Sequence, residues 1–136
     1  MDLAEAVSFA RSHHRSVLAT RKADGSPQQS PVVHAVDPEG RVLISTREPA
    51  VKVRNLRRDA RVSLCILNDQ FFGAWAQLDG TADIVPLPAA LPLLEYLYRE
   101  VAGEHPDWEE FRRAMADERR VVLRITPTAG GPSRSG

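Results

Sequence analysis

Apolar and polar residues alternate along several short segments of this chain, and a period of two is typical of strands that bury one face. In residues 61–67, Val62, Leu64 and Ile66 alternate with smaller or more polar side chains. The segments with strand character are 15–21, 28–36, 41–46, 61–67, 71–85 and 119–126. The sequence therefore predicts six short strands.

Proline and glycine modify two of these predicted strands. Pro31 lies inside the second segment and cannot donate a ladder hydrogen bond, so we expect an edge or a bulge there. Gly73 and Gly80 lie in the long segment 71–85, where we expect bends like those of a strand that curves around a barrel corner.

Apolar residues spaced three and four apart predict helices between the strands. One helix begins after Asp2, which is available as its cap, and a second begins at Pro49 and ends near Arg58. A third ends at Gly103, and a shorter fourth begins near Pro106. We expect the last two helices to pack against the sheet.

The order of these elements defines the fold class. Strands and helices do not alternate strictly, as they do in a parallel sheet, so we expect a mainly β protein with a closed, six-stranded antiparallel barrel. Residues 1–126 form one domain in this prediction, which suits a chain of 136 residues. The small residues of 127–136 predict a flexible C-terminal tail.

Composition excludes several classes of partner. Lysine plus arginine equals aspartate plus glutamate at 18 each, so no net charge attracts nucleic acid or an anionic membrane. The chain shows neither a signal peptide nor an apolar run near the roughly 18 residues that span a bilayer, so we expect a cytoplasmic protein. Cys65 is the only cysteine, and His13, His14 and His105 lack a second ligand at metal spacing, so we expect no disulfide and no metal site.

Positive charge is nevertheless concentrated between Arg47 and Arg61, where Glu48 and Asp59 are the only acidic residues. If a helix begins at Pro49, Lys52 lies in its first turn, where unpaired amides and the helix dipole disfavour a lone cation. A bound phosphate would reverse this effect, because it accepts hydrogen bonds from the amides and from the lysine.

We therefore predict a phosphate site in residues 45–57, with Arg54 or Arg57 in reach of the remaining oxygens. Ser45 and Thr46, at the end of the preceding strand, offer hydroxyl donors to the same group. An alternative stays open, in which the arginines form a solvated helix face. Contact with nucleic acid would need a basic domain with exposed aromatic residues between the charges, and the sequence has neither.

Three segments carry a resemblance to a known family. They are ATRKADGSPQQSPV, TREPAVKVRNLRRDARVSL and YREVAGEHPDWEEFRRAMADERRVVL. They resemble the split β-barrel flavin and deazaflavin oxidoreductases related to pyridoxamine-phosphate oxidase, and the likeness spans nearly the whole chain. Within that family the chain is most similar to the actinobacterial group that uses the deazaflavin coenzyme F420. In that group the barrel is a homodimer, and the cofactor lies in a groove between the subunits.

The resemblance implies that Lys52 contacts the cofactor phosphate, with Arg54 and Arg57 near it. It also implies four residues along the ring or the ribityl chain. These are Gln28, Ser30, Pro31 and Ser45. Similar proteins often carry an arginine two positions before the lysine, where this chain has Ala50, and an aromatic-glycine segment after the last strand, where this chain has TAGGPSRSG.

The function implied is hydride transfer between coenzyme F420 and a conjugated acceptor such as an enone or a quinone. The sequence shows no dedicated nucleophile or paired carboxylates, so the catalytic residues are unknown and the work of the protein is mainly positioning. His34 is expected to be a structural or surface residue. Two alternatives remain, an oxidoreductase that uses flavin mononucleotide (FMN) and a non-catalytic carrier of a flavin-type cofactor.

Overall fold

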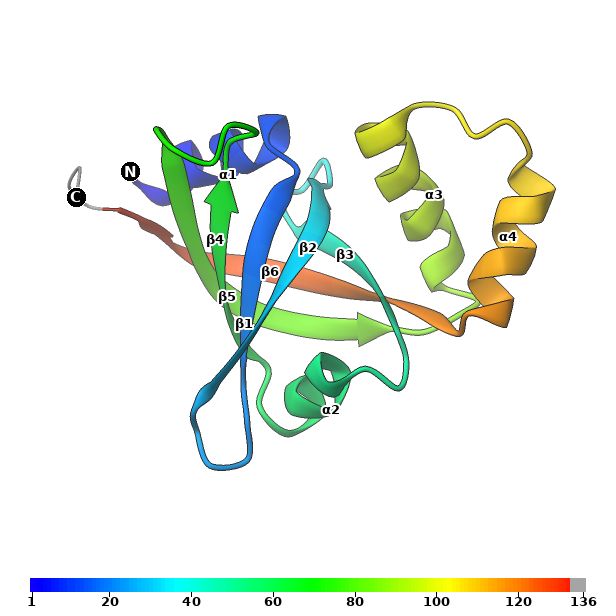
Figure 1. The fold of residues 1–136 in the computed structure, drawn as a ribbon, viewed down its shortest axis with the longest axis horizontal. Helices are drawn as coiled ribbons and strands as arrows, with labels where there is room; N and C mark the ends of the chain where they lie inside the picture. The colour runs from blue at the N-terminus through cyan, green and yellow to red at the C-terminus, as the bar shows by residue number, and fades with distance from the viewer. Residues whose placement is uncertain (133–136) are drawn as a thin grey trace.

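The computed structural model describes residues 1–132, and their strands close into an antiparallel barrel (Figure 1). The strands are β1 (Arg15–Arg21), β2 (Pro27–Val36), β3 (Val42–Arg47), β4 (Arg61–Leu67), β5 (Trp75–Val85) and β6 (Arg120–Gly131). Their order around the barrel is β1-β2-β3-β6-β5-β4. The predicted class, a mainly β protein with a six-stranded antiparallel barrel, is confirmed.

Four helices cover the ends and one side of the barrel (Figure 1). They are α1 (Leu3–Ser12), α2 (Val51–Arg58), α3 (Ala90–Ala102) and α4 (Trp108–Asp117). Ala6 of α1 and Val53 of α2 belong to the same buried cluster as the inward side chains of the strands, so the two helices close opposite ends of one core. The α3–α4 pair packs outside the barrel, on a second cluster that includes Leu43 and Val122. None of these helices is long and apolar enough to cross a membrane.

The predicted cap of α1 is confirmed. The side chain of Asp2 accepts a hydrogen bond from the backbone N–H of Glu5. In return, the backbone N–H of Asp2 donates to the carboxylate of Glu5. This capping box satisfies two of the amides that a helix leaves unpaired at its start.

Strands β2 and β3 diverge over half of their length. They pair only between His34–Val36 and Val42–Ile44, whereas residues 27–33 pair with β1 alone. The backbone N–H of His34 donates to the carbonyl oxygen of His14 on the β1 side (2.9 Å). Because the bonding direction alternates along an antiparallel strand, the backbone groups of residues 29, 31 and 33 point to the side without a strand. Pro31 therefore lies at an edge, as predicted, where its missing N–H costs no ladder hydrogen bond.

The end of the chain corrects the predicted tail. Strand β6 continues past Thr126 to Gly131, and Ala129 and Gly131 pair with Asp79 and Gln77 of β5. The small residues here reflect close packing rather than a loop, since a Cβ on Gly130 would lie 2.8 Å from the carbonyl oxygen of Asp2 beneath α1. The prediction of a tail over 127–136 is therefore wrong for 127–131, and residues 133–136 lie outside the described part.

Two other predicted boundaries shift. Strand β5 begins at Trp75 rather than at residue 71, and Gly73 lies in the preceding loop with a φ of 104°. Gly80 lies at a break in the register between β5 and β6, which agrees with the predicted bend. Helix α2 begins at Val51 rather than at Pro49.

Candidate functional site

The residues predicted to hold a cofactor lie around the point where β2 and β3 separate above α2, but they fall on two faces of the barrel wall (Figure 1). Ile44 belongs to the inner core, whereas Leu43 and the Ser45 partner Val122 belong to the outer cluster. Because successive strand residues point to opposite faces, Ser45 faces outward and Thr46 inward.

The same alternation divides the predicted residues of β2. Val32 packs against the inner core, so Gln28 and Ser30 share its inner face, and Pro31 and Val33 are exposed on the outer face. The structure therefore places Pro31 and Ser45 on the outer face and Gln28, Ser30 and Thr46 on the inner face. We give the name outer corner to Pro31, Val33 and Ser45 of the outer face together with Lys52 at the start of α2.

Lys52 is the second residue of α2, which follows β3 in the chain, and its side chain is half-buried. Within residues 1–132 it forms no ion pair, although ten other ion pairs are present. Burial lowers the pKa of its ammonium group, and the positive charge of Arg120 lowers it further. A partly buried cation without a counter-charge costs free energy, and a bound anion would offset that cost.

The start of α2 has the same bias toward an anion. The cap residue is Ala50, which provides no side-chain hydrogen bond, and the first turn contains no acidic residue. The first amides of a helix and its dipole both favour a negative group at this position. The replacement of the family's arginine by Ala50 removes a side-chain donor but leaves these backbone donors in place.

Arg54 and Arg57 are exposed on the outer side of α2. Arg57 donates to the carboxylate of Glu48 (3.2 Å), so an acidic group of the protein already contacts it. The same carboxylate pairs with Arg119 at 2.6 Å. Arg54 and Arg57 therefore agree with the alternative to a phosphate site, in which the arginines form a solvated helix face. The half-buried Lys52 does not belong to such a face.

A buried polar network links α2 to the β1–β2 hairpin. The side-chain amide of Asn55 donates to the hydroxyl of Thr20 (3.1 Å), and that hydroxyl donates to Gln28 (3.3 Å). Arg58 donates to the side-chain oxygen Oδ1 of Asn55 at 3.0 Å. Gln28 is therefore engaged in holding α2 against the barrel. Sequence analysis missed Asn55, although a polar residue between Val53 and Leu56 on the buried face of a helix is a recognisable signal.

Ser30 occupies a different environment. Its hydroxyl oxygen is buried and has no hydrogen-bond partner among the described residues. Unpaired buried hydroxyls are uncommon, since leaving one unbonded costs about 1–3 kcal/mol. The oxygen lies on the inner face, away from the outer corner.

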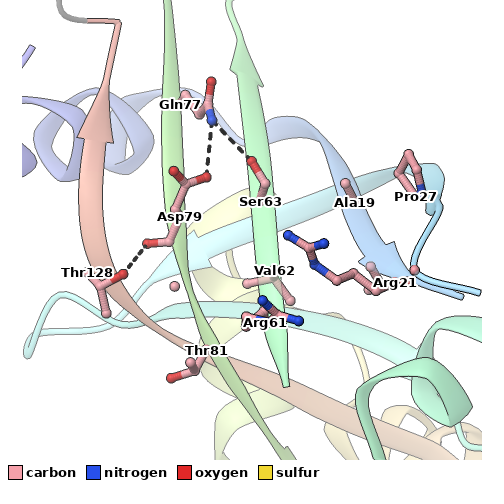
Figure 2. Close-up of a pocket in the computed structure, with 13 residues that line it drawn as sticks. Ala19, Arg21, Pro27, Arg61, Val62, Ser63, Gln77, Asp79, Thr81 and Thr128 are labelled. Atoms are coloured by element: carbon pink, nitrogen blue, oxygen red, sulfur yellow. Dashed lines mark hydrogen bonds between the residues drawn. The ribbon is translucent and has the colours of Figure 1, made fainter. Parts of the chain in front are cut away.

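A separate groove of about 730 Å³ lies on the outer face of β1, β4 and β5, near the tip of the β1–β2 hairpin (Figure 2). Figure 2 shows Arg21 and Arg61 on one side and Gln77, Ser63 and Asp79 on the other. Gln77 donates to Ser63 (3.3 Å) and to Asp79 (3.1 Å). None of the predicted cofactor residues lines this groove.

Arg61 is not a free cation in the groove. It forms a two-pronged contact with Asp59, with distances of 3.0 and 2.7 Å, and these hydrogen bonds lower the pKa of the Asp59 carboxyl to about 2. The groove is therefore less basic than its two arginines suggest. Within residues 1–132, no group of three histidine, cysteine or acidic side chains is arranged to hold a metal ion.

The fold defines a class, the split β-barrels, in which six antiparallel strands close with helices at the ends and on one side. The pyridoxamine 5'-phosphate oxidase family model matches residues 3–132, and the chain belongs to this family. The family predicted from sequence is thus confirmed.

Solved structures share the fold over nearly the full chain. A conserved hypothetical protein of Mycobacterium tuberculosis is 26% identical, with a TM-score of 0.75, and the match covers 100% of this chain and 92% of that one. A protein named F420 reductase is 23% identical, with a TM-score of 0.69 and coverage of 91% and 94%. A putative pyridoxamine 5'-phosphate oxidase of Listeria innocua is 16% identical, with a TM-score of 0.69 and coverage of 98% of each chain.

Proposed function

We propose that this chain is an oxidoreductase that binds coenzyme F420 at the outer corner and transfers hydride between it and a conjugated acceptor of the enone or quinone type. The observation that carries the proposal is Lys52, a half-buried cation at the start of α2 that has no ion-pair partner among residues 1–132. Membership of the family supplies the expectation of a flavin-type cofactor.

Each residue of the outer corner has a distinct part in this proposal. Lys52 and the first amides of α2 bind the phosphate, and the hydroxyl of Ser45 donates a hydrogen bond toward the ribityl chain. Pro31 and the exposed Val33 offer apolar contact to a ring, while the backbone groups of residues 29 and 33 face the same open side. These donors and acceptors orient a planar ring along the free edge of β2.

The bound deazaflavin supplies or accepts the hydride at a ring carbon. We assign no catalytic side chain, because the outer corner contains no group placed as a nucleophile. The contribution of the protein is then to hold the two reacting carbons within about 3.5 Å and to keep their orientation fixed.

We also propose that the chain is a homodimer, as the family resemblance implies. The outer face of β2, β1, β4 and β5 carries a row of register partners, which are Val33, Arg15, Leu67 and Trp75, with Val17 beside it. Apart from the charged Arg15, these exposed or half-buried side chains are apolar, and apolar area of this kind is a common contact surface. A second subunit on this face would lie next to the outer corner. A cytoplasmic location stays a prediction.

The protein named F420 reductase supports the deazaflavin over FMN, although its likeness to this chain establishes only the fold. The test is a fluorescence titration of the purified protein with each oxidised cofactor. We expect binding of the deazaflavin at least about tenfold tighter than that of FMN, a difference of about 1.4 kcal/mol. Tight FMN binding without deazaflavin binding would replace the cofactor in the proposal.

Turnover separates an enzyme from a carrier. Reduced deazaflavin mixed with the protein and a panel of enones and quinones is expected to be oxidised faster than without protein. Cofactor that binds but is not oxidised in the presence of any acceptor would favour the carrier alternative.

A further inference from the structure

The groove near the tip of the β1–β2 hairpin has a floor of small side chains. On the outer face of the barrel, Ala19 of β1 pairs with Ser63 of β4, and Ser63 pairs with Asp79 of β5. Two positions further along, Arg21 and Arg61 carry long side chains. Short side chains beside long ones leave a hollow of about 730 Å³, a volume typical of small-molecule pockets.

The positive side of the groove is Arg21. Figure 2 shows its side chain extending from β1 toward β4, and within residues 1–132 it forms no ion pair. Arg61, in contrast, is held by Asp59. Hydrogen bonds from Arg61 are the main cause that lowers the pKa of the Asp59 carboxyl, and the charge of Arg21 adds a smaller contribution. Two arginines and one carboxylate leave one net positive charge on this side.

The negative side of the groove is Asp79, whose side chain is half-buried and has no ion pair in the described part of the chain. Gln77 donates to one of its carboxylate oxygens (3.1 Å) and to the hydroxyl of Ser63 (3.3 Å). The carboxylate is therefore held in place by a neutral donor, which leaves its charge unbalanced. A partly buried carboxylate without a counter-charge costs free energy, and a bound cation would offset that cost.

The two unpaired charges lie on opposite sides of β4. Since β1 and β5 are the two neighbours of β4 in the barrel, their backbones are about 10 Å apart, and no ion pair joins Arg21 to Asp79. A ligand with a single charge would balance one side and leave the other unpaired. A ligand with both charges balances both, because a guanidinium group binds a carboxylate with two parallel hydrogen bonds and a carboxylate accepts from an ammonium group.

We propose that this groove is a second binding site, which takes a small zwitterion of the amino-acid type with its carboxylate at Arg21 and its ammonium group at Asp79. The hydroxyl of Ser63, on the floor between them, is a further donor to the ligand. None of the residues predicted to hold the cofactor lines the groove, so the inference goes beyond the proposed function and does not depend on it. The apolar row with Leu67 and Trp75 lies at the opposite end of the same strands.

The test is isothermal titration calorimetry of the purified protein with three compounds that share one carbon chain. The compounds are γ-aminobutyrate, which carries both charges, butyrate, which carries only the negative one, and butylamine, which carries only the positive one. We expect γ-aminobutyrate to bind at least about tenfold tighter than either of the others, because each charge-assisted hydrogen bond contributes about this factor or more. Equal affinities for the three compounds, or no binding of any of them, would overturn the inference.

Two variants assign the charges to their residues. In Arg21→Gln we expect γ-aminobutyrate to bind only as tightly as butylamine, and in Asp79→Asn only as tightly as butyrate. Lys22→Gln is the matched control, because it removes one positive charge beside Arg21 in the chain but does not line the groove. We expect it to leave the affinity for γ-aminobutyrate within about twofold of wild type. If Lys22→Gln weakens binding as much as Arg21→Gln does, the preference comes from the general charge of the hairpin, and the site is not the groove.

Discussion

Gly80→Ala is expected to lower the free energy of unfolding by about 3 kcal/mol or more, the range of overpacked or strained sites. Gly80 lies at the register break between β5 and β6, where a Cβ would stand 2.3 Å from the carbonyl oxygen of Thr126 and 3.1 Å from the Cα of Pro127. Both neighbours are backbone atoms, so no side chain can rotate away and the strands must separate.

Urea unfolding followed by circular dichroism measures this loss. Gly131→Ala is the matched control, because it makes the same change between the same two strands, where the new Cβ meets only the Cβ of Gln77 at an ordinary 3.7 Å. We expect the control to stay within about 0.5 kcal/mol of wild type. Equal losses in the two variants would show that the close strand contact at Gly80 is not what requires glycine there.

Acidification from pH 7 to pH 5 is expected to destabilise the protein by about 2 kcal/mol through His34 alone. His34 is fully buried, and its Nε2 lies 3.1 Å from the carbonyl oxygen of Ala10 in α1. A carbonyl oxygen can only accept, so Nε2 carries the proton, and Nδ1 accepts from the hydroxyl of Ser16 at 2.8 Å. The neutral ring is thus bonded at both nitrogens.

Burial is the main cause that lowers the pKa of His34 from 6.5 to about 4. Hydrogen bonds to the backbone of Ala10 and His13 oppose the shift, and the charges of His14 and His13 add to it. Between these two values the unfolded chain binds a proton that the folded chain does not. Stability is therefore unaffected by this group above about pH 6.5 and falls by about 1.4 kcal/mol per pH unit below it.

The measurement is the free energy of unfolding in urea at several values between pH 7 and pH 5, for wild type and for His34→Gln. The variant is expected to be less stable at pH 7 but to lose little further stability on acidification. A slope in the variant as steep as in wild type would assign the acid sensitivity to other groups.

The barrel could be predicted in detail where one strand face meets the core. The bounds of β1 and β4 agree with the predicted 15–21 and 61–67, because the alternation of apolar residues is regular there. The end of β6 could not be predicted, since the residues that pack beneath α1 must be small, and small residues are equally typical of a loop.

The candidate site was only partly predictable. The position of Lys52 in the first turn of a helix is confirmed, whereas its contact with a phosphate stays a prediction. The opposite orientations of Ser45 and Thr46 follow from strand alternation and could have been predicted from their adjacency. The contact of Glu48 with Arg119, 71 positions apart, depends on the way β3 and β6 pair, which local sequence patterns do not contain.

Whether Lys52 binds the phosphate of a flavin-type cofactor is tested most directly by comparing the cofactor dissociation constants of Lys52→Gln and Arg54→Gln. Both variants remove one positive charge from α2, but Arg54 is exposed and Lys52 is half-buried. We predict that Lys52→Gln weakens binding by about 1.5–3 kcal/mol, the contribution of a charge-assisted hydrogen bond, and that Arg54→Gln weakens it by less than about 0.5 kcal/mol. A dissociation constant for Lys52→Gln equal to that of wild type would contradict the account.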